Sequence, residues 1–146
     1  MTFVNQANTK HRPGGAYSNV IAKIGQDGVC PFCPENLAKY HPNPIIRAGG
    51  FWLLTKNAYP YEGAAHHFLL IHKAHIESFE QLTPAAWAEL QTLLNFVLTD
   101  NAIKGAALAF RFGDTAFTGA SVAHLHAQLI AGSGATDAKP VLMRVG

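Results

Sequence analysis

The chain has 146 residues, of which 49% are hydrophobic and 14% are charged, and its formal net charge is +2 at pH 7. This length fits one domain, and the low charge together with nine Phe residues excludes a disordered polyelectrolyte. The small net charge without a Lys/Arg run argues against a nucleic-acid surface, and no segment is apolar enough to span a membrane. Without a signal-peptide pattern at the start, we expect a cytoplasmic protein.

The first part of the chain predicts little regular structure. Residues 1–28 have weak periodicity and several glycines, which indicates an N-terminal arm with one short strand at residues 17–24. Residues 29–146 form the predicted domain. Four prolines within residues 30–50 favour a loop there, with at most one helical turn at residues 35–39.

The middle and end of the chain have clearer patterns. Short apolar runs predict strands, the first two of them an antiparallel pair, at residues 51–57, 67–72, 106–112 and 123–131, with a further possible strand at residues 140–145. A long helix is predicted to start at Thr83-Pro84, because Thr is a good N-cap and Pro suits the first helical position. Its apolar stripe consists of Trp87, Leu90, Leu94, Val97 and Leu98. Strands before and after one long helix predict an α+β fold with an antiparallel sheet.

Eight histidines stand out against the low charge, and most fall within residues 66–75 and 124–126. In a strand, His124, His126 and Gln128 share one face because side chains alternate. A neutral imidazole can attack phosphorus and form a covalent nucleotidyl-histidine. Alternatively, these side chains are hydrogen-bonded structural groups or metal ligands.

The turn before this strand contains donors for phosphoryl oxygens. Gly119, Ala120 and Ser121 offer turn amides and a hydroxyl, and Gln128 can donate through its amide but cannot carry a proton as His can. A phosphate site built from imidazole, hydroxyl and amide groups needs no Lys/Arg cluster, so the low charge of the chain does not argue against phosphate chemistry.

Two cysteines form a second candidate site. Cys30 and Cys33 have the spacing of metal or redox chemistry, and a structural zinc site needs two more ligands, for which His75 and His124 are candidates. His41 competes as a third ligand. Alternatively, Cys30 and Cys33 are a redox pair, or two loop cysteines without a chemical role.

Four blocks in this order resemble the histidine triad (HIT) superfamily. They are Cys30-Pro-Phe-Cys33, Lys56-Asn-Ala-Tyr-Pro-Tyr61, His67-Phe-Leu-Leu-Ile-His-Lys-Ala-His75-Ile and Gly119-Ala-Ser-Val-Ala-His124-Leu-His126-Ala-Gln128. The resemblance implies a five-stranded antiparallel sheet with one long and one short helix, a homodimer, and hydrolysis or transfer at the α-phosphate of nucleotides.

Site roles are implied by matching these blocks position by position. His126 matches the nucleophile and His67 the residue that supports its strand, while Ser121 matches a contact to the phosphate or leaving group. The implied substrate-binding residues are Asn57, Gly119, Ala120 and His124. In zinc-bearing members the metal ligands correspond to Cys30, Cys33, His75 and His124, which disfavours His41.

The chain also departs from the family pattern. Gln128 replaces the third histidine, as in the branch that includes galactose-1-phosphate uridylyltransferase and some nucleotide phosphorylases. His72 replaces the usual proline, and Gly113-Asp114 stands where small hydrolases often carry an Asn-containing pair. The resemblance predicts a nucleotide hydrolase or nucleotidyltransferase that acts on nucleoside phosphoesters, dinucleoside polyphosphates or phosphoramidates. The alternatives are a nucleotide-binding module with little turnover and a zinc-organised structural protein.

Overall fold

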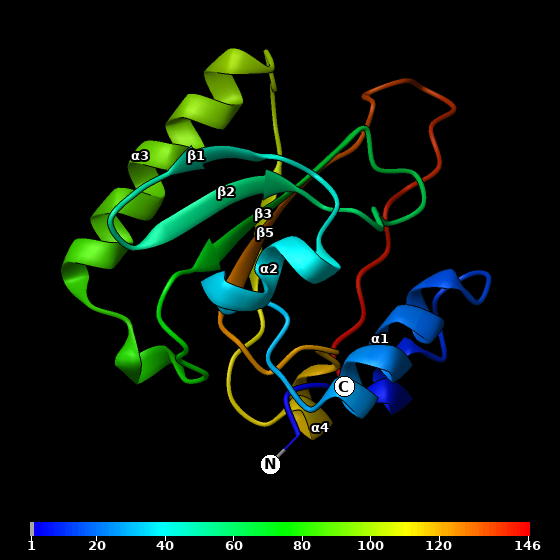
Figure 1. Ribbon diagram of the computed structural model, residues 1–146. Coiled ribbons are helices and arrows are strands. Elements are labelled where there is room, and N and C mark those ends of the chain that lie inside the picture. Colours follow the sequence, from blue (N-terminus) through cyan, green and yellow to red (C-terminus); the bar gives the residue numbers. More distant parts are fainter. Residues whose placement is uncertain (1) are drawn as a thin grey trace.

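The computed structural model describes residues 2–146 and folds them around one five-stranded antiparallel sheet (Figure 1). The strands follow the spatial order β1-β2-β3-β5-β4. Their bounds are β1 (Ile45–Ala48), β2 (Trp52–Lys56), β3 (His66–His72), β4 (Ala107–Phe110) and β5 (His126–Ala131). The predicted α+β class with a five-stranded antiparallel sheet is confirmed, and so is the antiparallel pairing of β2 with β3.

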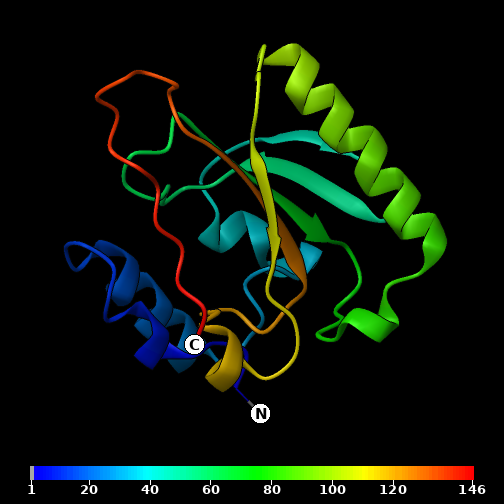
Figure 2. The same ribbon diagram turned by 180° about the vertical axis from the view of Figure 1, so that it is seen from behind.

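Helices cover both faces of the sheet (Figures 1 and 2). The long helix α3 (Pro84–Asp100) packs on one face, where it starts as predicted: Pro84 occupies the first turn and the Thr83 hydroxyl accepts a hydrogen bond from the Ala86 amide at 3.1 Å. The short helix α2 (Pro34–Tyr40) lies on the other face. No helix within residues 2–146 is long and apolar enough to cross a membrane.

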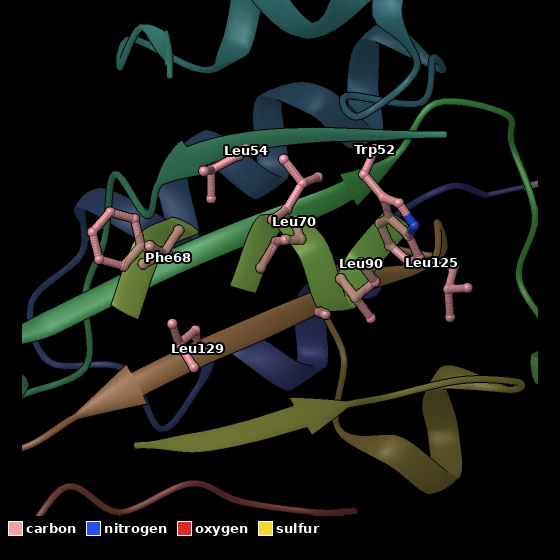
Figure 3. Close-up of a cluster of buried hydrophobic side chains, with 10 residues drawn as sticks. Trp52, Leu54, Phe68, Leu70, Leu90, Leu125 and Leu129 are labelled. Carbon is pink, nitrogen blue, oxygen red and sulfur yellow. The ribbon is translucent and has the colours of Figure 1, made fainter. Parts of the chain in front are cut away.

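The main core lies between α3 and the sheet (Figure 3). It contains one fully buried Trp and a set of Leu and Phe side chains: Trp52, Leu54, Phe68, Leu70, Leu90, Leu125 and Leu129. The indole N–H of Trp52 donates to the Ala86 carbonyl at 2.7 Å, so this large side chain leaves no buried donor unpaired. Because each buried Leu or Phe contributes about 1.5–3 kcal/mol, this layer is the main source of stability.

The chain termini meet at one end of the molecule. Helix α1 (Ala16–Asp27) and the 3-10 helix η1 (Gln6–Thr9) lie beside α4 (Thr115–Thr118), and the C-terminal tail ends there as well (Figures 1 and 2). Asn8 joins the N-terminal arm to the α4 region, since its amide donates to the carbonyls of Thr115 at 2.9 Å and Ala120 at 2.7 Å. The other 3-10 helix, η2 (Phe79–Gln81), precedes α3.

Two predictions for the N-terminal third are wrong. Residues 17–24 form part of helix α1 and not a strand, because Ile21 and Ile24 bury one helical face and Gly28 ends the helix at φ 69°. The segment after Cys33 is also more ordered than predicted. Pro34 starts a seven-residue helix there, and β1 follows it.

Smaller differences concern the rest of the chain. Residues 140–145 contain no strand. Trp87 does not face the core as predicted: it is 45% exposed and stacks on Phe110 at a centroid distance of 5.7 Å. The strands β4 and β5 are shorter than the predicted segments, so His124 precedes β5 while His126 opens it.

Candidate active site and metal centre

A cavity of about 740 Å³ lies between the start of β5, helix α1 and the C-terminal tail. Six of the predicted site residues line it: Asn57, Gly119, Ala120, Ser121, His126 and Gln128. The predicted substrate contact His124 is not on its wall and lies in the metal cluster described below. His67 is buried behind the wall, on β3 beside β5.

The ring of His126 is held in one tautomer. Its Nδ1 lies 2.7 Å from the backbone carbonyl of His124, and a carbonyl only accepts, so Nδ1 carries the proton and donates. Nε2 therefore keeps its lone pair. Burial is the main reason that the pKa of His126 falls to about 4, with a further lowering from the positive charge of Arg111. The imidazole is consequently neutral near pH 7.

Gln128 is oriented by His67. The backbone amide of Tyr61 donates to His67 Nδ1 at 3.1 Å, so the proton of a neutral ring sits on Nε2. That nitrogen donates to Gln128 Oε1 at 2.7 Å. Because the oxygen of Gln128 is engaged in this way, its N–H groups are left for a partner in the cavity. Burial is the main cause that lowers the pKa of His67 to about 4.

Backbone amides in the turn before β5 already form hydrogen bonds within the chain. The amide of Gly119 donates to Thr115 O at 3.1 Å and that of Ala120 to Thr118 Oγ1 at 3.1 Å, so these two amides already have partners within the chain. The Ser121 hydroxyl is hydrogen-bonded to the hydroxyl of Tyr17 on α1. Gly119 adopts φ 76°, and a Cβ there would meet backbone atoms of Gly146 at 3.1 Å.

Cys30, Cys33, His75 and His124 come together on the other side of the β5 start, and we call this set the metal cluster. One ligand atom of each lies within 4.8 Å of all the others. His124 Nδ1 is 3.3 Å from Cys30 Sγ and 3.2 Å from His75 Nδ1, and Cys33 Sγ is 3.5 Å from His75 Nδ1. Tetrahedral zinc with bonds of about 2.0–2.3 Å requires ligand separations of about 3.3–3.8 Å, so the spacing fits.

The chemistry of the donors fits a metal cation as well. His124 Nε2 donates to the His72 carbonyl at 2.6 Å, which leaves Nδ1 as a bare ligand nitrogen with the backbone partner that metal-bound histidines usually have. Burial and the neighbouring Cys30 raise the pKa of Cys33 to about 12, so a cation is needed to hold both thiolates. His41 is outside the cluster, with its Nε2 2.7 Å from Thr55 Oγ1.

The sequence did not predict the cationic side chains of the cavity. Five of the chain's eleven Lys and Arg residues line it, namely Lys10, Arg12, Arg111, Lys139 and Arg144. The low charge of the whole chain therefore does not extend to this cavity. These residues are scattered along the chain without a motif, and only folding brings the arm and the tail to the cavity.

This architecture, a five-stranded antiparallel sheet with a histidine pair at the start of a central strand, is the fold of histidine triad proteins. No model of a known protein family matches the sequence, and no curated protein matches it. Solved structures do match. A HIT family hydrolase from Clostridium thermocellum shares 27% identity at a TM-score of 0.58, over 77% of this chain and 96% of that chain.

Two further solved structures share the fold at lower identity. A Zn-bound histidine triad family protein from Mycobacterium smegmatis is 19% identical at a TM-score of 0.57, over 77% of this chain and 81% of that chain. A hypothetical histidine triad nucleotide-binding protein from Sulfolobus tokodaii is 23% identical at a TM-score of 0.57, over 73% of this chain and 70% of that chain. These two structures show the fold alone, and the hydrolase at 27% identity supports the histidine triad superfamily.

Proposed function

We propose that this protein is a nucleotide hydrolase or nucleotidyltransferase that acts at the α-phosphate through a covalent nucleotidyl-His126. The observation that carries the proposal is the His126 Nδ1–H donated to the His124 carbonyl at 2.7 Å, which leaves a neutral Nε2 at the cavity. The similarity to a HIT family hydrolase supports an enzyme of this class. Nucleoside phosphoesters, dinucleoside polyphosphates and phosphoramidates are the proposed substrates.

In the proposed first step, the lone pair of Nε2 forms a bond to the α-phosphorus. The bond from phosphorus to the leaving group breaks, and its electron pair departs with that group, which takes up a proton from solvent. Water or phosphate then attacks phosphorus and loses a proton, and the phosphorus–nitrogen bond electrons return to Nε2. The reaction needs no redox change.

The other predicted site residues have supporting roles in this proposal. Gln128 donates its amide N–H to the phosphoryl oxygens as their charge develops, and His67 holds Gln128 in that orientation. Ser121 contacts the phosphate or leaving group, and Asn57 lies near the nucleoside. Gly119 and Ala120 act through the shape of the turn, since their amides are already hydrogen-bonded.

We propose zinc for the metal cluster. Two thiols and two imidazole nitrogens are a common zinc ligand set, and four protein ligands complete a structural site. The Zn-bound histidine triad protein from Mycobacterium smegmatis supports this choice. When bound, zinc would tie the Cys30–Cys33 loop to the residues before β5, and it would take no part in the chemistry.

A second candidate function is nucleotide binding with little turnover. It is favoured by Gln128, which cannot carry a proton where the usual family pattern has a histidine. The alternative within the enzyme class is the uridylyltransferase and phosphorylase branch, where phosphate or a phosphosugar replaces water as the acceptor. Product analysis with and without added phosphate separates hydrolysis from phosphorolysis, and tight binding of AMP without any product indicates the binding module.

We also propose a cytoplasmic homodimer. Strand β4 is at the edge of the sheet, and large apolar side chains around it are exposed, among them Leu108, Phe112 and Trp87. A second copy of the chain can cover this edge. The free thiols of Cys30 and Cys33 favour a reducing compartment. A monomeric mass in sedimentation would contradict the dimer.

The decisive experiment is mass analysis of the protein after rapid quenching with a panel of nucleotide esters. We expect a nucleotide adduct on His126 in the wild type and none in His126→Ala or His126→Gly, with turnover lowered by more than about 10⁴-fold. His66→Ala is the matched control, because His66 lies outside both the cavity and the metal cluster. Unchanged turnover in both His126 variants would overturn the nucleophile assignment.

A further inference from the structure

The cavity has an excess of positive charge that the proposed chemistry at one phosphate does not use. Its lining includes five cationic side chains and one acidic side chain, that of Glu62. Within residues 2–146, only Lys139 of these cations forms an ion pair, with its Nζ 2.7 Å from a Glu62 oxygen. Lys10, Arg12, Arg111 and Arg144 have no such partner in the described part of the chain.

Arg12 of the N-terminal arm is held in place by aromatic rings. Its guanidinium lies 4.7 Å from the ring centroid of Tyr17 and 4.8 Å from that of Tyr61, and it donates a hydrogen bond to the Tyr59 carbonyl. A cation fixed in this way is positioned before any ligand arrives. Tyr17 is also hydrogen-bonded to Ser121, so the arm that carries Arg12 is joined to the proposed phosphate site.

Arg111 and Arg144 connect the other side of the cavity to the C-terminal tail. Arg111 donates to the Tyr61 hydroxyl at 3.0 Å and to the Arg144 carbonyl at 2.6 Å. Its Nε is the one buried side-chain nitrogen or oxygen within residues 2–146 that has no hydrogen-bond partner. These neutral partners leave the guanidinium charge without a counter-ion.

Arg12 and Arg111 both contact Tyr61, and Arg144 lines the same cavity. Like charges in one cavity repel unless a ligand supplies the opposite charge. Guanidinium groups match phosphate oxygens in planar, bidentate hydrogen bonds, so the favoured ligand is a phosphate group. A neutral amine or alcohol would leave the charges uncompensated.

We infer that the N-terminal arm and the C-terminal tail build a second anion subsite from Arg12, Arg111 and Arg144, here called the arginine cluster. This subsite selects a leaving group or acceptor that carries its own phosphate over a neutral amine or alcohol. The predicted substrate selectivity rests on the proposed function, because the second phosphate is defined relative to the one that His126 attacks. Anion binding by the arginine cluster does not depend on turnover.

The first test is therefore a binding test in the full chain without catalysis. Inorganic tripolyphosphate is titrated by calorimetry into His126→Ala and into the same protein with Arg12→Gln or Arg144→Gln added. We expect each added change to weaken binding at least tenfold, and Arg12→Lys to restore part of it. Arg47→Gln is the matched control, because Arg47 is exposed on β1 away from the cavity and its guanidinium lies over Phe96. Equal binding by all these proteins, or no binding by any, overturns the arginine cluster.

The second test is kinetic. We expect Arg12→Gln and Arg144→Gln to lower kcat/KM at least tenfold for a dinucleoside tetraphosphate and less than threefold for adenosine 5′-phosphoramidate, whose leaving group is neutral. Equal losses on both substrates would make the arginines structural and overturn the selectivity.

The kinetic test also separates the two sources of the second phosphate. A slower burst of nucleotidyl-enzyme assigns it to the leaving group, and slower transfer to added phosphate assigns it to the acceptor. If no substrate is turned over, the proposed function fails, while the tripolyphosphate titration still decides whether the arginine cluster binds anions.

Discussion

His124 and His126 are two residues apart, yet they serve two different regions of the molecule. His124 donates Nε2–H to the His72 carbonyl and turns its bare Nδ1 toward the metal cluster. His126 donates Nδ1–H to the His124 carbonyl and keeps a bare Nε2 at the cavity. In both cases a backbone carbonyl accepts a hydrogen bond from one ring nitrogen, and this fixes which of the two nitrogens keeps its lone pair. The difference in chemistry therefore comes from what surrounds the free nitrogen: thiols in the metal cluster, and an arginine-lined space in the cavity.

The largest effect is expected from removing a thiol of the metal cluster. We expect Cys30→Ser to lose bound zinc and more than about 4 kcal/mol of unfolding free energy, because Cys30 is buried and three ligands do not complete a structural site. Elemental analysis and chemical denaturation measure the two losses. His41→Ala is the control and should keep its metal, since His41 is bonded to Thr55. Full zinc retention by Cys30→Ser would contradict the four-ligand site.

Gln128→Glu should lower turnover at the cavity while the metal cluster keeps its metal. The glutamate keeps the oxygen that accepts from His67 but replaces the amide donor with a second, negatively charged oxygen facing phosphate. Loss of one such donor typically costs about 10²–10³ in kcat, and we expect a fall in that range with unchanged zinc content. Steady-state kinetics and elemental analysis on one preparation test both. Activity within twofold of the wild type would show that Gln128 does not contact the reacting phosphate.

His67 allows a test of the cavity side by pH. Its pKa is about 4, mainly because of burial, and nearby Arg12, Arg111 and His126 lower it further. The unfolded chain binds a proton at this residue below about pH 6.5, whereas the folded chain binds it only near pH 4. Stability from the neutral ring is thus present above pH 6.5 and lost as pH falls toward 4.

We expect His67→Gln to flatten the decline of unfolding free energy over this pH window by up to about 1.4 kcal/mol per pH unit. Denaturation curves at several pH values, with zinc present throughout, give both slopes. Metal release on acidification affects both proteins and cancels in the difference. Parallel curves would mean that His67 titrates alike in the folded and unfolded chains.

The two regions also differ in how far they could be predicted. The metal cluster and the pair His126 and Gln128 could be predicted because short motifs carry them, and β3 and α3 because local periodicity and an N-cap define them. Helix α1 could not, because only Ile21 and Ile24 are buried on it and glycines flank it. Arg12 and Arg144 lie near opposite ends of the chain, so only long-range packing brings them to one cavity.

The smallest expected effect comes from Phe32, which touches both regions at once. Its ring lies edge-on to His126 at a centroid distance of 5.0 Å and to His124 at 6.1 Å. Edge-to-face pairs contribute about 0.5–1.5 kcal/mol beyond their buried area, so the closer contact should matter more. We expect Phe32→Leu to lower turnover about threefold to tenfold and to change zinc affinity less than that. Competition with a chromogenic chelator measures the affinity.

Phe79→Leu is the control for Phe32→Leu, because Phe79 is exposed and contacts neither histidine. A larger loss of zinc affinity than of turnover would reverse the expected order and assign Phe32 to the metal cluster. Full activity with unchanged metal binding would show that the two rings are held by their backbone hydrogen bonds alone. The result therefore measures how much of the difference between His124 and His126 depends on a shared side chain, and how much on the two carbonyls that fix their tautomers.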